Sequence, residues 1–219
     1  VWKAQDQRLG RTVAVKILPE SSAADLRIRF EQEARAASAL QHPNIVRIYD
    51  FGKLRDNYFI AMEYVDGEDL ASLLKRIGRL SGAKALEIAR QICAGLAAAH
   101  DRGVLHRDLK PANIYLHRTT TGMLVGKILD FGISKVQSGG ATNFALTKTG
   151  TVVGSPAYMS PEQASGRDDL DGRADVWSVG VVLFESLTGT LPHQAANYNA
   201  LMVRILTSDV EPIQKRRPD

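Results

Sequence analysis

The stretch HRDLKPAN, residues 106–113, gathers a histidine, two basic residues, an aspartate and an asparagine within eight positions. Hydrophobic residues precede it at Val104 and Leu105 and follow it at 114–116, so we predict a short loop held between two very short strands. A rigidly held loop with acidic, basic and amide side chains is a common place for catalysis, although a solvated turn would have a similar composition. The rest of the sequence must distinguish the two.

A second polar position, Asp130, ends a short apolar strand and is followed by Phe131 and Gly132. An aspartate so close to a glycine is, by itself, more often a turn residue than a metal ligand. Here it follows Asp108 and Asn113 in a strand, loop, strand and turn order that can bring three oxygen donors together. Such hard donors suit magnesium, which keeps water and takes phosphate oxygens as its remaining ligands.

Lys16 interrupts a strand, residues 13–18, that is otherwise apolar on both faces. Because an ammonium group without a partner is costly to bury, Lys16 must extend to solvent or meet an anion. In the helix that follows, Glu33 falls within the apolar stripe at the helical rotation of about 100° per residue. We therefore predict a buried or half-buried ion pair between Lys16 and Glu33; two unrelated surface residues are the alternative.

The elements that must position these side chains follow from the spacing of the apolar residues. The first part of the chain reads as a small antiparallel sheet with one helix over 24–40, and its predicted strands are 1–4, 12–18, 45–51 and 58–64. The remainder is mainly helical, with predicted helices near 70–76, 83–99 and 176–187 and a short strand over 127–129. The helix over 176–187 is apolar nearly all round, which predicts burial on every side. Residues 133–155 are rich in Gly, Ser and Thr and predict a long loop of the kind that is usually functional.

In this order, the motifs resemble those of a bacterial, eukaryotic-like Ser/Thr protein kinase. Residues 14–16 resemble the kinase Val-Ala-Ile-Lys strand, with Val15 in place of Ile, and HRDLKPAN resembles the catalytic loop. Asp-Phe-Gly at 130–132 resembles the metal-binding turn, and Ser-Pro-Glu at 160–162 the Ala-Pro-Glu motif. The resemblance covers essentially the whole chain. It implies an α+β, protein-kinase-like bilobal fold in which a small antiparallel sheet and one helix are followed by a mainly helical lobe.

The resemblance also implies where the lobes divide. Residues 1–65 would be the N-lobe and residues 66–219 the C-lobe. The family's first strand and Gly-rich loop are expected immediately before Val1, and further helices after Asp219. We therefore expect an incomplete kinase domain, truncated at both ends.

The resemblance assigns a role to each polar residue of the loop and turn. Asp108 would accept or orient the proton of a substrate hydroxyl, and Lys110 would support the transferred γ-phosphoryl group. Lysine at this position is typical of Ser/Thr rather than Tyr kinases. Asn113 and Asp130 would hold Mg²⁺, with Mn²⁺ as an alternative.

Other residues would bind ATP. Lys16, held by Glu33, would bind the α and β phosphates. The remaining contacts are expected from Val1 and Ala14 above the adenine, Tyr115 below it, Met62 as gatekeeper, the backbone of Glu63 and Val65 at the hinge, and Asp69 at the ribose. For Met62 and Tyr115, packing in the apolar core is an equally good explanation.

The long loop would be the activation segment. Thr147, Thr149 and Thr151 lie where such kinases are phosphorylated, and Arg107 would pair with the new phosphate. Ser155 stands where the family usually has threonine and retains its hydroxyl group. Solvated loop threonines without a regulatory role are the alternative.

Two further features are carried over from the family. Asp175 would anchor the catalytic loop by accepting hydrogen bonds from the backbone around His106 and Arg107, with a helix N-cap as its other role. The side chains that would join the lobes in an active kinase are Ala37, Ile48, His106 and Phe131. Because Ala37 is small, that contact is expected to be loose.

Composition excludes several other classes. The formal net charge is +4 and the basic residues are scattered, which predicts no nucleic-acid-binding face. The single cysteine, Cys93, lies in an apolar helical pattern and is predicted to be a core residue, without a disulfide framework. No signal peptide or span of about 18 apolar residues is present, so we expect a cytoplasmic location, with any membrane anchor outside this span.

The leading hypothesis is an ATP-dependent protein Ser/Thr kinase that is regulated by activation-loop phosphorylation, acts on protein substrates and forms a homodimer for trans-autophosphorylation. The alternative is an inactive fragment or pseudokinase scaffold that binds protein partners. Loss of Lys16, Asp108 or Asp130 would have indicated a pseudokinase, and all three are present.

Overall fold

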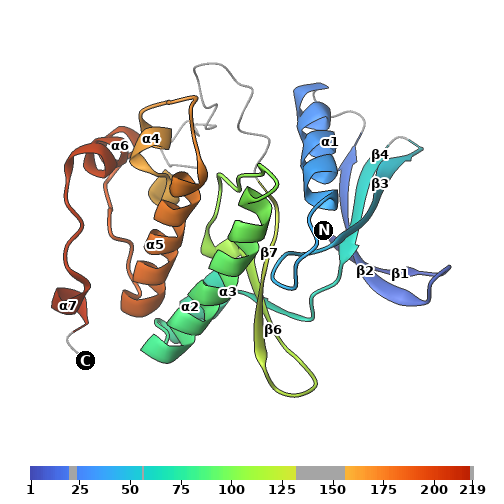
Figure 1. The fold of residues 1–219 in the computed structure, drawn as a ribbon, viewed down its shortest axis with the longest axis horizontal. Coiled ribbons are helices and arrows are strands. Elements are labelled where there is room, and N and C mark those ends of the chain that lie inside the picture. Colours follow the sequence, from blue (N-terminus) through green and yellow to red (C-terminus); the bar gives the residue numbers. More distant parts are fainter. Residues whose placement is uncertain (20–23, 56, 132–155, 218–219) are drawn as a thin grey trace.

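The computed structural model describes residues 1–19, 24–55, 57–131 and 156–217 (Figure 1). A four-stranded sheet with helix α1 (Ala24–Ser38) lies beside a larger, mainly helical part that contains a second, three-stranded sheet. We call these two parts the sheet lobe and the helical lobe. The predicted α+β architecture is confirmed.

The sheet lobe is an antiparallel sheet in the order β1-β2-β4-β3. Its strands are β1 (Trp2–Asp6), β2 (Arg11–Pro19), β3 (Ile48–Leu54) and β4 (Asn57–Glu63). The turn between β1 and β2 forms because the Asp6 carboxylate accepts hydrogen bonds from the backbone N–H groups of Arg8 and Leu9. Gly10, with φ of +65°, completes the turn in a conformation that favours glycine. Phe30 and Ala34 of α1 pack on the apolar side chains of β4.

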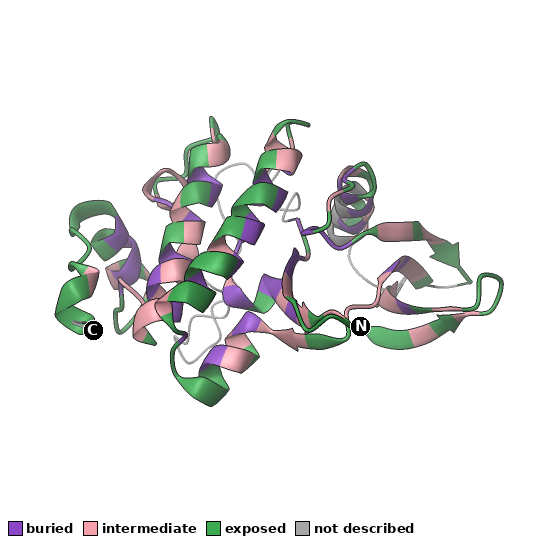
Figure 2. Cartoon of the chain, turned by 60° about the horizontal axis from the view of Figure 1, so that its bottom comes forward, coloured by how far each residue is buried: buried purple, intermediate pink, exposed green. Residues whose placement is uncertain are grey.

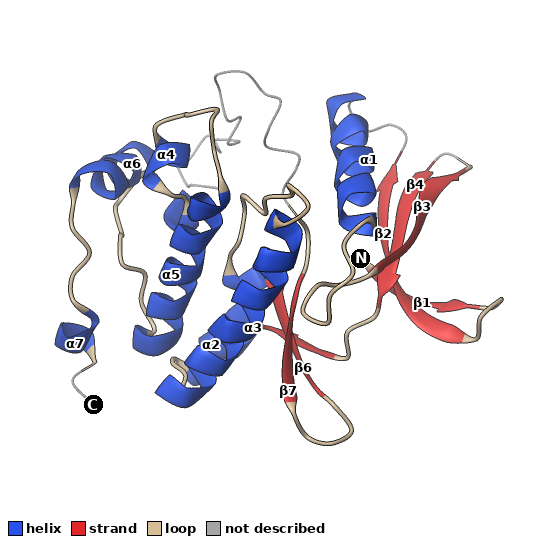
Figure 3. Cartoon of the chain, in the orientation of Figure 1, coloured by secondary structure: helices blue, strands red, loops and turns tan. Residues whose placement is uncertain are grey.

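The helical lobe is built around two long helices, α3 (Gly82–His100) and α5 (Gly172–Thr188), which pack against each other (Figure 3). The shorter helices are α2 (Leu70–Ile77), α4 (Pro161–Ala164), α6 (Tyr198–Thr207) and α7 (Ile213–Arg216). Its antiparallel sheet has the order β5-β6-β7, with strands β5 (Gly67–Asp69), β6 (Ile114–Arg118) and β7 (Leu124–Ile128). Two 3-10 turns, η1 (Pro111–Asn113) and η3 (Pro156–Tyr158), complete the described elements.

The largest core lies between α3, α5 and the three-stranded sheet, and Figure 2 shows buried residues along the inward faces of the long helices. A separate apolar core joins α1 to the four-stranded sheet. A third, around Met159, Leu201 and Ile205, joins α6 to the segment before α4. No helix in the described ranges is both long and apolar enough to cross a membrane.

Several local predictions were wrong at the edges of elements. Val104 and Leu105 form no strand, because the Val104 N–H group bonds to the carbonyl oxygen of Ala99 and ends helix α3 instead. The strand predicted from residue 45 begins at Ile48, since the preceding residues pair with β7. Strand β5 was not predicted.

Burial also corrected two expectations. Cys93 is exposed, because it lies beside rather than within the stripe of α3 formed by Ile88, Ile92 and Leu96. Helix α5 is not buried all round, since the Val176 side chain is 64% exposed.

Candidate active site

The loop over residues 106–113 is anchored to helix α5 by a buried carboxylate. Asp175, in the first turn of α5, is fully buried and accepts hydrogen bonds from the backbone N–H groups of His106 and Arg107, both at 2.8 Å. The His100 Nε2 atom lies 2.7 Å from the same carboxylate. The predicted anchoring by Asp175 is confirmed, whereas its N-cap role is wrong because Asp171 caps α5.

His106 packs at the centre of this arrangement. Its ring lies 5.0 Å from the ring of Phe131, its Nε2 atom is 2.9 Å from the carbonyl oxygen of Leu129, and its Nδ1 atom accepts the N–H of Asp108 at 3.3 Å. One donor and one acceptor match the neutral imidazole. Burial lowers the pKa of His106, although the Asp175 carboxylate opposes the change, so the neutral form is favoured.

The side chains predicted to join the lobes lie near one another, and His106 contacts Phe131 directly. Ala37 and Ile48 lie with Phe131 around a small apolar cavity that is also lined by Met62. Ala37 itself is buried, and the loose contact expected there stays a prediction.

The polar side chains of the loop are brought together by an ion pair and a hydrogen bond between residues of the loop itself. The Lys110 ammonium lies 2.9 Å from the Asp108 carboxylate, and the Asn113 amide nitrogen donates to the Asp108 carbonyl oxygen at 3.0 Å. The backbone N–H of Leu129 donates to the Asn113 carbonyl oxygen at 2.9 Å, and this bond brings the residue directly before Asp130 next to Asn113. Asp130 has a φ of +49°, in the left-handed region that residues other than glycine seldom adopt.

Lys16 of β2 reaches this group from the sheet lobe. Its ammonium lies 3.1 Å from Oδ1 of Asp130, and the two side chains are 27% and 43% exposed. Glu33 falls within α1, but its side chain lies outside the described residues. The ion pair between Lys16 and Glu33 therefore stays a prediction.

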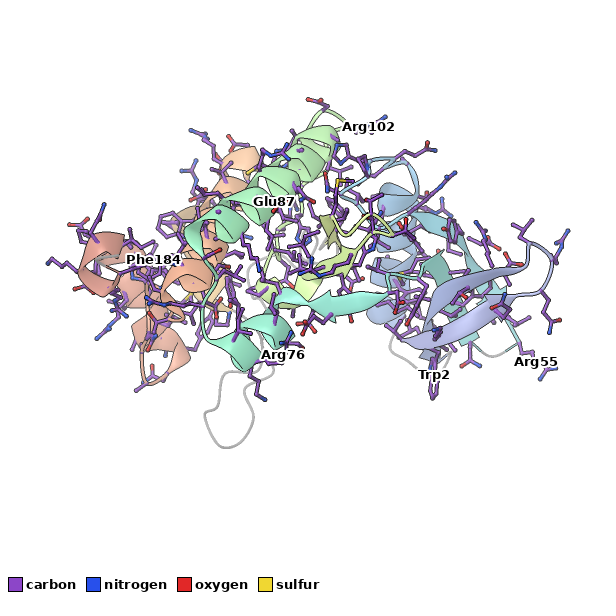
Figure 4. All side chains as sticks on the ribbon, turned by 90° about the horizontal axis from the view of Figure 1, so that it is seen from below. Trp2, Arg55, Arg76, Glu87, Arg102 and Phe184 are labelled. Carbon is purple, nitrogen blue, oxygen red and sulfur yellow. The ribbon has the colours of Figure 1, made fainter. Side chains whose placement is uncertain are left out.

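A cavity of about 250 Å³ opens between the two lobes. Seven of the predicted site residues line it, namely Val1, Ala14, Met62, Glu63, Val65, Tyr115 and Asp130. Sequence reasoning missed four others, namely Trp2, Lys3, Tyr64 and Leu129. Trp2 projects outward from β1 (Figure 4), and Lys3 lies over the Tyr64 ring at 4.4 Å. The position of Leu129 directly before Asp130 was the signal that could have identified it.

Asp69, which was predicted at the ribose, does not line the cavity. Its carboxylate accepts hydrogen bonds from the Ser72 backbone N–H at 2.9 Å and from the Ser72 hydroxyl at 2.6 Å, and so caps α2. A larger hollow of about 830 Å³ lies on the other face of the four-stranded sheet, where Val13, Val15 and Ile17 point. It contains none of the predicted catalytic residues.

Of the residues with a predicted regulatory role, the structure describes only Arg107. Thr147, Thr149, Thr151 and Ser155 lie outside the described residues. Arg107 is half-buried with a φ of +63°, and its carbonyl oxygen accepts a hydrogen bond from the Gln163 side chain at 2.9 Å. Burial lowers the pKa of the Arg107 guanidinium, an effect that the Asp175 charge opposes. The Gln163 contact, which ties α4 to the catalytic loop, was not predicted, and no local pattern around Gln163 indicates it.

This arrangement is that of a protein kinase: a small sheet with one helix lies beside a mainly helical lobe, and acidic and amide side chains lie at their junction. The protein kinase domain family matches residues 1–217, and the chain belongs to that family.

Individual relatives agree. The chain is 41% identical over its whole length to serine/threonine-protein kinase pkn3 of Myxococcus xanthus and covers 40% of that protein. It is 40% identical over its whole length to serine/threonine-protein kinase PknD of Mycobacterium tuberculosis and covers 32% of it. Over 88% of this chain, serine/threonine-protein kinase PknB of Mycobacterium leprae is 42% identical, and 30% of that protein is covered. The chain therefore spans less than half the length of these relatives.

Proposed function

We propose that the protein transfers the γ-phosphoryl group of ATP to Ser or Thr hydroxyl groups of protein substrates. The observation that carries the proposal is the single hydrogen-bonded unit, anchored on Asp175, that holds Asp108, Lys110 and Asn113 next to Asp130. The printed names of the three relatives, all serine/threonine-protein kinases, support the same activity.

In the proposed reaction, the substrate hydroxyl oxygen bonds to the γ-phosphorus as the bond to the bridging oxygen of ADP breaks. The hydroxyl proton moves to the Asp108 carboxylate and from there to solvent. Lys110 stabilises the charge that spreads over the transferred group. The Lys110 ammonium lies 2.9 Å from the Asp108 carboxylate, so both groups would face the transferred phosphoryl group together.

Members of the family use ATP and a divalent metal ion. The donor chemistry fits such an ion, because the Asn113 amide nitrogen is engaged by Asp108, which leaves its side-chain oxygen for a cation beside the Asp130 carboxylate. We assign Mg²⁺ to these two residues, with Mn²⁺ as the alternative. When bound, the ion neutralises phosphate charge. Lys16, which Glu33 would position, would exchange Asp130 for the α and β phosphates.

The cavity of about 250 Å³ is the proposed adenine site. Ala14 and Tyr115 would contact the two sides of the base, Met62 would close its inner end, and the backbone of Glu63 and Val65 would bind its edge. Asp69 would bind a ribose hydroxyl group through the acceptor sites that its cap on α2 does not use.

The regulatory proposals rest on the family alone. Phosphorylation of Thr147, Thr149 or Thr151 would engage Arg107, and Ser155 would contact the catalytic loop. We further propose residues 1–65 and 66–219 as the two lobes, a homodimer for trans-autophosphorylation and a cytoplasmic location.

The test is transfer of radiolabelled phosphate from ATP to a generic protein substrate by the full-length protein, with Mg²⁺ present. We expect transfer by the wild type and none above background by the Asp108→Asn variant. Absence of transfer by the wild type would favour the pseudokinase scaffold.

A further inference from the structure

The peptide unit that joins Arg107 to Asp108 is held at both of its polar groups. Its carbonyl oxygen, on Arg107, accepts a hydrogen bond from the Gln163 side-chain nitrogen at 2.9 Å. Its N–H group, on Asp108, donates to Nδ1 of His106 at 3.3 Å. The next peptide unit is held as well, because the Asp108 carbonyl oxygen accepts a hydrogen bond from the Asn113 side chain at 3.0 Å. Since a turn of either peptide plane would swing the Asp108 side chain, these bonds together determine where its carboxylate points.

Arg107 is the residue of the loop that most needs such support. Its φ of +63° lies in the left-handed region, which residues other than glycine seldom adopt and which persists only where neighbouring groups hold it. The Arg107 N–H group donates to the Asp175 carboxylate at 2.8 Å. Arg107 is therefore held at its N–H group by α5 and at its carbonyl oxygen by α4.

The orientation of the Gln163 amide follows from the way in which helix α4 begins. Ser160 is the N-cap, and its hydroxyl group accepts the Gln163 N–H at 3.3 Å. In return, Oε1 of Gln163 accepts the Ser160 N–H at 3.1 Å, which completes a capping box. Because the capping box uses the amide oxygen, the amide nitrogen is left to donate to the Arg107 carbonyl oxygen.

Helix α4 is fixed to the helical lobe by contacts that do not involve the catalytic loop. The Ser160 side chain is fully buried, and Ala164 packs against the apolar core that joins α6 to this segment. Just before α4, the carbonyl oxygen of Tyr158 accepts a hydrogen bond from the Ser178 hydroxyl of α5 at 2.8 Å. Gln163 therefore gives the catalytic loop a second support in addition to Asp175.

We propose that Gln163 is a positioning residue that sets the direction of the Asp108 carboxylate. Glutamine meets both demands of this position, because one amide atom caps α4 and the other holds the Arg107 carbonyl oxygen. The inference rests on the proposed kinase function, in which Asp108 accepts the hydroxyl proton. Neither Arg107 nor Gln163 lines the proposed adenine cavity, so the effect should fall on phosphoryl transfer and not on ATP binding.

The test begins with Gln163→Glu in the full-length protein. Glutamate has nearly the same shape and keeps the acceptor oxygen for the capping box, but its second oxygen cannot donate to the Arg107 carbonyl oxygen. We expect kcat to fall about tenfold while KM for ATP stays unchanged, because a displacement of about 1 Å can cost about 100-fold in rate. An unchanged kcat would overturn the proposal.

Gln163→Met separates the lost hydrogen bond from the added negative charge. Methionine removes both side-chain bonds of Gln163 without introducing a charge, so kcat should fall by a similar factor. A wild-type kcat in Gln163→Met together with a reduced kcat in Gln163→Glu would mean that the charge caused the loss, and the positioning role would then be wrong.

Ser160→Ala is the matched control. It removes the hydroxyl group that accepts the Gln163 N–H and so weakens the cap of α4, but it leaves both side-chain bonds of Gln163 in place. We expect a lower unfolding temperature and an unchanged kcat. Equal decreases of kcat in Ser160→Ala and Gln163→Glu would mean that Gln163 acts only through the stability of α4.

Amide hydrogen exchange, followed by NMR, tests the same contact without any activity. In Gln163→Met, the Asp108 N–H should exchange at least about tenfold faster than in the wild type, because its peptide unit can turn away from His106. The Arg107 N–H, which Asp175 binds, should keep its protection. Equal exchange of the Asp108 N–H in both proteins would show that the peptide is held without Gln163. If the wild type transfers no phosphate, the proposed function fails, but the exchange experiment still gives its own answer.

Discussion

The two sides of the proposed site are held in place by different kinds of interaction. In the helical lobe, the backbone of His106 and Arg107 is bonded to the fully buried carboxylate of Asp175. From the sheet lobe, Lys16 meets Asp130 through an ion pair whose side chains are 27% and 43% exposed. Buried hydrogen bonds to charged groups contribute about 1.5–3 kcal/mol, and exposed ion pairs about 0–1 kcal/mol. The catalytic loop is therefore preset, whereas the position of Lys16 is adjustable.

This difference between the two lobes sets an order of events in the proposed reaction. The groups that would act on the substrate hydroxyl are in place before a nucleotide binds, because their bonds lie within one lobe. Lys16 must exchange one anion, Asp130, for another, the phosphates. A weak contact suits this exchange, since a strong one would compete with ATP.

The largest expected effect comes from the preset side. Asp108→Asn should lower kcat by about 10²–10⁴-fold, because the amide cannot accept the hydroxyl proton. Steady-state phosphotransfer measures the change, and Asp209→Asn, an exposed aspartate near the end of α6, is the control. Near-wild-type kcat in Asp108→Asn would mean that another group is the base.

On the adjustable side, Lys16→Met should lower kcat/KM by about 10²–10³-fold, because the phosphates lose the positive charge that would bind them. The unfolding free energy should change by less than about 1 kcal/mol, as expected for a partly exposed ion pair. Lys75→Met, on the exposed face of α2, should change neither quantity. A large loss of stability in Lys16→Met would show that both sides are equally rigid.

A smaller effect is expected from weakening the anchor. Asp175→Asn keeps one acceptor oxygen but loses the other, and we expect a decrease of about 1–3 kcal/mol in the unfolding free energy. We also expect a drop of about tenfold in kcat as the loop loses its fixed geometry. Asp171→Asn on the same helix is a matched control, because asparagine also caps a helix well. Denaturant unfolding and kinetics, measured together, test whether loop geometry and stability change in parallel.

The smallest effect concerns pH. Burial lowers the pKa of both His106 and His193, and Arg204 lowers that of His193 further. Each histidine then binds fewer protons when folded than when unfolded. Its contribution to stability is complete above the unfolded-state pKa of about 6.5 and is lost as the pH falls toward the lower folded-state value.

His193→Phe tests this directly. His193 is stacked on Trp177, with ring centroids 6.4 Å apart, and its Nε2 atom has no hydrogen-bond partner among the described residues. Phenylalanine should keep the stacking and reduce the loss of stability between pH 7.5 and pH 5.5. Equal pH dependence of unfolding in the variant and the wild type would exclude His193 as a contributor.

Residue types and spacing were enough to identify the polar centre of the site. Asp108, Asn113 and Asp130 lie within a short stretch of chain, so local strands and turns determine most of their relative positions. The apolar periodicity located the main helices and strands for the same reason, because each element depends on neighbours a few residues away.

Contacts between residues that are distant in the sequence could not be predicted in this way. The Asn44 side chain donates a hydrogen bond to the side chain of Gln91, 47 residues away, and neither residue stands out in its local pattern. The exposure of Cys93 and the cap that occupies Asp69 depended likewise on what else packs nearby. The sequence by itself determined which side chains could do chemistry and on which elements they lie. Only the tertiary structure decided which buried amides bond to each other, because such pairing depends on surfaces that meet only after the chain has folded.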